Sequence, residues 1–221
     1  MPLFYQHIIN STTKLGIWHI TEDKKFFLQK VFVQKNITHP HKRLQHLAGR
    51  YLLKYLFPDF PHEEIFIADT RKPYLPNEQY HFSISHCGNY AAALVSSTHR
   101  VGIDIELPSE KVQRIAHKFV NESEWQYLSM DDRPQSIENC QPSTDDRQLL
   151  TVLWSAKEAL FKWYGLGEVD FSEDMQLHHF IQKQNDSLIL PFVFKKDLMT
   201  ELNIHSKIFD EIVLSWIAAE K

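Results

Sequence analysis

Residues 101–106, VGIDIE, have the composition of a buried strand, yet two of their six side chains are carboxylates. Side chains alternate along a strand, so Asp104 and Glu106 share one face with Gly102, while the aliphatic side chains take the other face. Two like charges roughly 7 Å apart, beside a glycine that leaves room for a ligand, indicate either a water-exposed face or a bound cation.

The overall composition is that of an ordinary globular protein. With 221 residues, 43% hydrophobic and 24% charged, the chain can bury a core as one large domain or two small ones. No apolar run approaches the ~20 residues of a membrane span, and the N-terminus lacks the features of a signal peptide, so we expect a cytoplasmic protein. Cys87 and Cys140 form neither a disulfide framework nor a metal-binding spacing, and we expect both to be reduced thiols.

Charge is distributed unevenly along the chain. The net charge of −4 argues against a general nucleic-acid-binding protein. Residues 1–100 contain 12 Lys and Arg against 7 Asp and Glu, whereas residues 101–221 contain 12 against 21. The first half could therefore hold an anion and the second half a metal ion, although two solvated surfaces of different charge explain the distribution equally well.

Periodicity predicts two long helices with a small sheet between them. Apolar residues at helical spacing predict helices over about 41–57 and about 147–164. The segments 80–86, 90–96 and 100–106 have strand composition and are separated by turn residues, which predicts an antiparallel meander. The ends of its first and third strands should then meet at one edge of the sheet.

The second half of the chain carries three weaker signals. Asn121 and Glu124 have the spacing of a capping box that opens a short helix. Residues 129–146 are polar, contain two prolines and are predicted to form a surface loop. Two apolar runs in the tail, residues 187–196 and 211–220, are predicted to be strands.

A weak internal repeat relates the two predicted helices. At an offset of 108 residues several positions agree, among them the pairs Ala48/Ala156, Leu52/Leu160 and Lys54/Lys162. A duplicated unit of strand, helix and further strands explains the match, and two such copies usually meet along a shared cleft. Chance similarity between two amphipathic helices is the alternative.

The second predicted helix has an unusual polar face. Trp154 and Phe161 flank Glu158 on the side opposite the apolar stripe, and Lys162 follows one turn later. A surface ion pair between Glu158 and Lys162, worth about 0.2–0.5 kcal/mol, is the simpler interpretation. Two aromatic side chains beside it favour the wall of a cleft instead.

Three carboxylates then suggest a metal site. Asp104, Glu106 and Glu158 would offer only oxygen ligands, which suit Mg²⁺ or Mn²⁺ rather than zinc. The predicted meander brings Ser85 and His86 to the same edge as Asp104. A hydrolytic Ser–His–Asp triad is a poor fit because adjacent strand residues point to opposite faces.

Phosphate binding is the better use of the polar residues near that edge. Ser85 and His86, with Arg71 and Lys72 of the loop TRKPYLP, could contact phosphate oxygens. A basic stripe on the first helix could reach a further phosphate, although such stripes are often only solvated faces; its members are Arg43, Arg50 and Lys54.

Taken together, these motifs resemble a known family. RKPYLP, FSISHCGNYAAALV, VGIDIE and WSAKEALFKWYGLG occur in the order found in 4′-phosphopantetheinyl transferases of the larger, surfactin-synthetase-activating type. The resemblance covers residues 43–167, roughly three fifths of the chain. It implies an α+β fold of two similar subdomains related by a pseudo-twofold axis, each an antiparallel sheet packed with a long helix. The active site would lie in the cleft between residues 1–100, which bind coenzyme A phosphates, and 101–221, which carry the metal site and the catalytic helix.

The resemblance also implies the reaction and its residues. The phosphopantetheine arm of coenzyme A would be transferred to a serine of an apo acyl or peptidyl carrier protein, with Mg²⁺ as cofactor and adenosine 3′,5′-bisphosphate as product. The implied metal ligands are Asp104, Glu106 and Glu158. The implied contacts to coenzyme A come from Lys72, Ser85, His86, Lys157 and Lys162, with Arg43 or Arg50 meeting the 3′-phosphate.

In this mechanism Glu158 takes the proton of the attacking serine and Lys162 stabilises the transferring phosphate. We expect a monomer that binds neither nucleic acid nor membranes. Two other classes remain open: another Mg²⁺-dependent enzyme acting on a diphosphate or nucleotide, and a non-catalytic binder of coenzyme A or a carrier protein.

Overall fold

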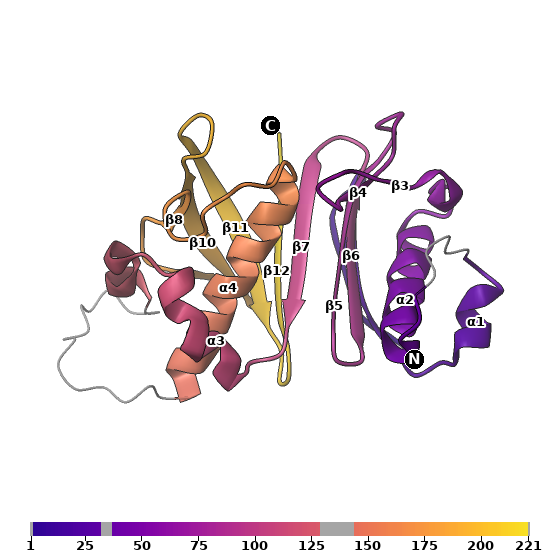
Figure 1. The fold of residues 1–221 in the computed structure, drawn as a ribbon, viewed down its shortest axis with the longest axis horizontal. Helices are drawn as coiled ribbons and strands as arrows, with labels where there is room; N and C mark the ends of the chain where they lie inside the picture. Colours follow the sequence, from indigo (N-terminus) through magenta and orange to yellow (C-terminus); the bar gives the residue numbers. More distant parts are fainter. Residues whose placement is uncertain (1, 32–36, 129–143, 221) are drawn as a thin grey trace. The chain divides into compact units, whose positions relative to one another are not determined.

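The structure, a computed structural model, describes residues 2–31, 37–128 and 144–220 (Figure 1). The chain forms two compact units. Unit 1 comprises Met1–Ile105, Lys162–Gly165 and Ala218–Lys221, and unit 2 comprises Glu106–Phe161 and Leu166–Ile217. Each unit contains antiparallel strands and a long helix or most of one, so the predicted α+β class is confirmed. The functional division at residue 100 stays a prediction.

Unit 1 is built on a four-stranded antiparallel sheet with the strand order β1-β2-β6-β5. β2, one of the two inner strands of this sheet, is buried along most of its length. The strands are β1 (Leu3–Asn10), β2 (Thr13–His19), β5 (His81–Cys87) and β6 (Tyr90–Ser96).

The predicted meander is only partly correct. β5 and β6 pair antiparallel from His81↔Ser96 to Cys87↔Tyr90, as expected. The other neighbour of β6 is β2, whereas β7 (Arg100–Glu106) was expected there. The N-terminal strand takes this position because pairing between distant segments is set by tertiary packing, which local turn residues do not encode.

The long helix of unit 1, α2 (Pro40–Leu56), matches its prediction within one residue at each end. Proline at its start is preorganised for the first turn, and the side chain of His39 accepts a hydrogen bond from the backbone N–H of Lys42. Its apolar stripe packs on β2, β5 and β6, with which the helix shares the core of the unit. Figure 1 shows α2 along one face of this sheet.

A glycine sets the distance between α2 and the sheet. A Cβ atom added at Gly49 would lie 2.6 Å from Cγ2 of Ile84 on β5, closer than real contacts allow. Only the absence of a side chain at this position lets the helix approach β5 so closely. This close approach brings the polar start of α2 beside the end of β5.

Unit 2 contains a second antiparallel sheet, in which β12, β11, β10 and β8 follow one another and β9 also pairs with β10. The two predicted tail strands are confirmed as β10 and β12. The strands are β8 (Met175–Leu177), β9 (Gln182–Gln184), β10 (Ser187–Phe194), β11 (Thr200–Ile208) and β12 (Val213–Ala219).

The second long helix, α4 (Thr144–Tyr164), was expected to start near residue 147. Its buried residues include Leu153, Ala156 and Leu160 of the predicted apolar stripe. The predicted capping box of Asn121 and Glu124 is present, but it opens a 3₁₀ helix, η3 (Glu122–Tyr127). Cys140 and most of the predicted loop 129–146 lie outside the described residues.

Short elements connect these parts. Among the helices that the structure describes, none combines the length and apolar character that a membrane span requires. The short helices are α1 (Lys24–Leu28), η1 (His62–Glu64), α3 (Glu110–Ile115) and η2 (Ala116–Lys118), and a two-stranded ribbon is formed by β3 (Phe66–Ile67) and β4 (Pro73–Tyr74).

Candidate functional site

A buried polar cluster lies in unit 1, where β5, β7 and the last turn of α4 meet. We call Ser85, Asp104 and Lys162 the Asp104 cluster. The hydroxyl of Ser85 donates to Oδ1 of Asp104 at 2.7 Å. The ammonium of Lys162 donates to the same oxygen at 2.6 Å and to Oγ of Ser85 at 2.9 Å. The predicted approach of Ser85 to Asp104 is therefore confirmed, although β7 does not pair with β6.

One atom of this cluster lacks a partner. Asp104 is only 3% exposed, and in the part of the chain that the structure describes its Oδ2 accepts no hydrogen bond. Burying a carboxylate oxygen without a donor or a cation costs free energy. Such an uncompensated group requires a specific cause, and a cation bound beside Oδ2 would supply one.

His86 does not complete a hydrolytic triad. Its ring packs against that of His46 on α2, with the centroids 5.2 Å apart in a T-shaped arrangement. The hydroxyl of Ser85 donates directly to Asp104, whereas a triad requires an imidazole between the two. Burial lowers the pKa of His86, and the charges of Lys162 and Lys42 lower it further.

The residue of α2 that contacts β5 at this point is His46, which the sequence analysis did not single out. Its position could have been inferred from Gly49, which lies one turn later and faces the same strand. Arg43 and Arg50 lie one turn to either side of His46 along the helix, and both are partly buried. Their assignment to a 3′-phosphate stays a prediction.

Glu106 and Glu158 belong to unit 2. The indole N–H of Trp154 donates to Oε1 of Glu106 at 3.2 Å, which fixes one oxygen of this carboxylate. Glu158 is partly buried on the following turn of α4. Phe171, which was not predicted from the sequence, covers its aromatic neighbours: the ring of Phe171 stacks on Trp154 at 5.5 Å and lies 5.6 Å from the ring of Phe161.

Lys157 has a different role from the predicted contact with coenzyme A. Its side chain is 0% exposed, and its ammonium donates to the carbonyl of Phe119 at 2.5 Å, to Glu124 at 2.7 Å and to the carbonyl of Phe171 at 2.8 Å. These three bonds use every donor of the ammonium group. The expected cofactor contact is therefore corrected: in this arrangement the ammonium of Lys157 holds unit 2 together.

The predicted metal ligands have donor atoms of the type that a divalent cation requires. The buried, unpartnered Oδ2 of Asp104 suits a cation, and the oxygen atoms of Glu106 and Glu158 are the ligands that Mg²⁺ prefers. Within residues 2–31, 37–128 and 144–220, no three His, Cys, Asp or Glu side chains form a group that could hold a metal ion. The chemistry of the three carboxylates suits Mg²⁺, and the metal site itself stays a prediction.

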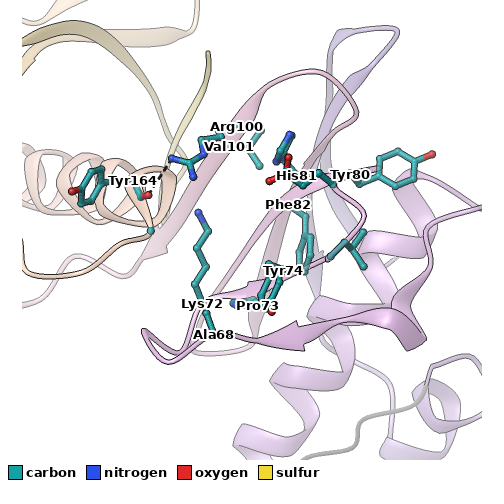
Figure 2. A pocket seen from close by; sticks show the side chains of 13 residues that line it. Ala68, Lys72, Pro73, Tyr74, Tyr80, His81, Phe82, Arg100, Val101 and Tyr164 are labelled. Carbon is teal, nitrogen blue, oxygen red and sulfur yellow. Dashed lines mark hydrogen bonds between the residues drawn. The ribbon is translucent and has the colours of Figure 1, made fainter. Parts of the chain in front are cut away.

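Lys72 lies at the opposite end of β5 from Ser85 and His86. It lines a pocket of about 230 Å³ in unit 1, together with His81, the first residue of β5, and Arg100, the first residue of β7. Figure 2 shows the side chains of Lys72 and Arg100 directed toward the end of α4. Burial, with a contribution from the charge of Arg100, lowers the pKa of Lys72 to about 8.

Lys72 is expected to react with an amine-acylating reagent at pH 8 at least about ten times faster than an exposed lysine such as Lys54. With a pKa of about 8 roughly half of its amine is unprotonated, whereas an ordinary lysine is about 0.4% unprotonated at this pH. Peptide mass spectrometry of briefly labelled protein measures both sites. Equal labelling of the two lysines would contradict the lowered pKa.

About half of the chain is similar in sequence to known proteins. The family model ACPS, the 4′-phosphopantetheinyl transferase superfamily, matches residues 100–216. The 4′-phosphopantetheinyl transferase gsp of Aneurinibacillus migulanus is 32% identical over 123 residues, which cover 55% of this chain and 46% of that protein. Enterobactin synthase component D of Escherichia coli K12 is 31% identical over 124 residues, 55% of this chain and 54% of the relative. The chain spans about half the length of the curated relatives it matches.

Proposed function

We propose that this chain, which belongs to the 4′-phosphopantetheinyl transferase superfamily, transfers the 4′-phosphopantetheine arm of coenzyme A to a serine of an apo acyl or peptidyl carrier protein. One observation carries the proposal: within the matched region, the buried Asp104 pairs with the partly exposed Lys162, and one of its carboxylate oxygens is left without a partner among the described residues. A cation and an anion side by side at this point suit a site that binds a diphosphate and its counterion.

The proposed reaction is a phosphoryl transfer. The serine oxygen of the carrier protein forms a bond to the phosphorus that bears pantetheine. The bond from that phosphorus to the bridging oxygen breaks, and adenosine 3′,5′-bisphosphate leaves with the electron pair. Little covalent chemistry falls to the protein in such reactions, so its task is to position the reactants and to stabilise charge.

The Asp104 cluster supplies groups for both tasks. The ammonium of Lys162, 26% exposed, can move from Asp104 to a phosphate oxygen and there offset the negative charge that develops in the transition state. The hydroxyl of Ser85 can then donate to a phosphate oxygen in place of Asp104. His86 and His46 lie at the same end of β5 and can extend these contacts.

Glu158 is the proposed base for the serine proton. It shares α4 with Trp154 and Phe161, whose contacts with Phe171 stiffen this part of the helix surface. Asp104, Glu106 and Glu158 are the proposed ligands of Mg²⁺, with Mn²⁺ as a substitute. When bound, the ion would neutralise phosphate charge.

Incubation of the protein with coenzyme A, Mg²⁺ and a panel of apo carrier proteins tests the function. We expect one or more carriers to gain the mass of the phosphopantetheine arm, and a carrier whose modified serine is replaced by alanine to gain none. Intact-protein mass spectrometry measures the gain. If coenzyme A were cleaved at the same rate without any carrier protein, the chain would instead be a hydrolase of diphosphates.

A further inference from the structure

The pocket beside Lys72 contains two positive charges without a matching carboxylate. Lys72 donates to the carbonyl of Trp163 at 3.3 Å and Arg100 to the carbonyl of Tyr164 at 3.4 Å, both at the end of α4. Both bonds are long for charged donors. In the part of the chain that the structure describes, neither residue forms a salt bridge.

The position of the Lys72 ammonium is built into the backbone. Gly165 ends α4 with a φ of +73°, and a Cβ atom added there would lie 2.4 Å from Nζ of Lys72. The left-handed backbone conformation and the missing side chain both favour glycine at this position. They leave a space that the ammonium occupies.

The lining of the pocket combines polar and apolar residues. His81 lines the pocket, and the exposed Glu78 is the one carboxylate among the lining residues. The apolar lining residues are Pro73, Tyr74, Leu75, Tyr80 and Phe82, and the ring of Tyr80 is directed away from the two cations (Figure 2). An exposed carboxylate is well screened by water, so it offsets the positive charge of the partly buried Lys72 and Arg100 only weakly.

We infer that this pocket, built from Lys72, Arg100 and His81, binds a phosphate group. A planar guanidinium and an ammonium directed at one space match the oxygens of a phosphate, which can accept from both at once. The volume of about 230 Å³ is large enough for a phosphate together with part of an organic group.

The pocket is separate from the Asp104 cluster. His81 and Ser85 are four residues apart on β5, as are Arg100 and Asp104 on β7, which corresponds to roughly 13 Å along each strand. A phosphate in the pocket therefore comes from one of two sources: a separate small phosphate, or a second phosphate of the substrate whose diphosphate lies at the Asp104 cluster. Only the second source rests on the proposed function.

Titration with inorganic phosphate tests the pocket itself. Phosphate is expected to raise the melting temperature of the protein more than sodium chloride of equal ionic strength, since a ligand that binds only the folded state stabilises it. Arg100→Ala should weaken phosphate binding at least about tenfold, because a charge-assisted hydrogen bond is lost. Arg100→Lys, which keeps the charge, should weaken it less.

Two further variants serve as controls in that titration. Arg114→Ala removes an exposed arginine from α3 and should bind phosphate as the wild type does. Lys162→Ala disables the other anion site and should retain the response that Arg100→Ala loses. Circular dichroism verifies that each variant is folded. If folded Arg100→Ala responded to phosphate as the wild type does, the inference would be overturned.

Binding of coenzyme A and of 3′-dephospho-coenzyme A, measured by calorimetry, then separates the two sources. If Arg100→Ala weakens only the binding of coenzyme A, the pocket takes the 3′-phosphate. If it weakens neither while phosphate binding is lost, the pocket takes a separate phosphate. Failure of the wild type to load any carrier protein would overturn the proposed function but leave the phosphate titration intact.

Discussion

Asp104→Ala is expected to lower kcat/KM for carrier loading at least about 10²-fold without lowering the melting temperature. Activity should fall because the variant loses a proposed metal ligand and the anion that orients both Ser85 and Lys162. Stability should be unchanged or higher, since the removed carboxylate carries a buried oxygen without a partner. Lys162 is 26% exposed and can reach water once its partner is gone.

The rate of carrier loading and the melting temperature should be measured on the same variants. Glu158→Gln should lose loading to a similar extent if the carboxylate acts as base and ligand. Asp210→Ala, which removes an exposed carboxylate from the turn before β12, should retain both properties. Wild-type loading rates for Asp104→Ala or Glu158→Gln would remove the basis of the site assignment. Loss of loading accompanied by a large fall in melting temperature would indicate a structural role instead.

Lys157→Met is expected to lower the free energy of unfolding by about 3–5 kcal/mol, because it leaves the buried carboxylate of Glu124 without its counterion. Glu124 also accepts the backbone N–H groups of Asn121 and Leu177, both at 2.7 Å, so it cannot turn away toward water. Burial lowers the pKa of Lys157 to about 8 and raises that of Glu124, against the attraction between them. Urea denaturation measures the loss.

Matched variants separate the ion pair from general effects of the substitution. Lys183→Met, on the exposed strand β9, should change the unfolding free energy by no more than about 0.5 kcal/mol. The double variant Lys157→Met/Glu124→Gln should be less destabilised than the sum of the single changes, because the remaining side chain is neutral. At a temperature where Lys157→Met is folded, its KM for coenzyme A should equal that of the wild type. A raised KM would instead support the prediction that Lys157 contacts coenzyme A.

The elements with strong local signals were predictable from the sequence. The helical periodicity around Leu47 and Leu52 located α2 to within one residue, and the pair β5 and β6 followed from two strand-like segments joined by the short turn at Gly88. Such patterns reflect which face of each element is buried, and this is encoded locally. The neighbour of β6 was not predictable, because the pairing of β2 with β6 joins segments about 80 residues apart.

The sequence contains a signal that Lys157 is buried, but this signal is easily overlooked because the next residue, Glu158, lies on the polar face. Successive residues of a helix lie about 100° apart, so these neighbours face different sides. Lys157 follows Leu153 by four residues and precedes Leu160 by three, which places it within the apolar stripe. A lysine at such a position indicates a buried partner. The identity of that partner, Glu124 in a capping box, depends on the tertiary fold.

Arg100 was missed for a related reason. It precedes the conspicuous carboxylates of VGIDIE, and its charge acquires meaning only beside Lys72, which comes from the turn between β3 and β4. These strands are two residues long, too short for any periodic signal. The contact of Ser85 with Asp104, in contrast, was predicted through an incorrect strand order. It was correct because Ser85 and Asp104 each lie two residues before the end of their strand, and these positions are in contact.

The contact between Gly49 and Ile84 has an evolutionary consequence. Volume can be moved from one of these positions to the other, but it cannot be added at both without displacing α2 from β5 and His46 from His86. An alanine in the helix would require a residue on the strand that lacks the Cγ2 methyl of Ile84, such as alanine. Sequence drift at this point therefore acts on the pair as a single unit, and the two positions should covary wherever this packing is inherited.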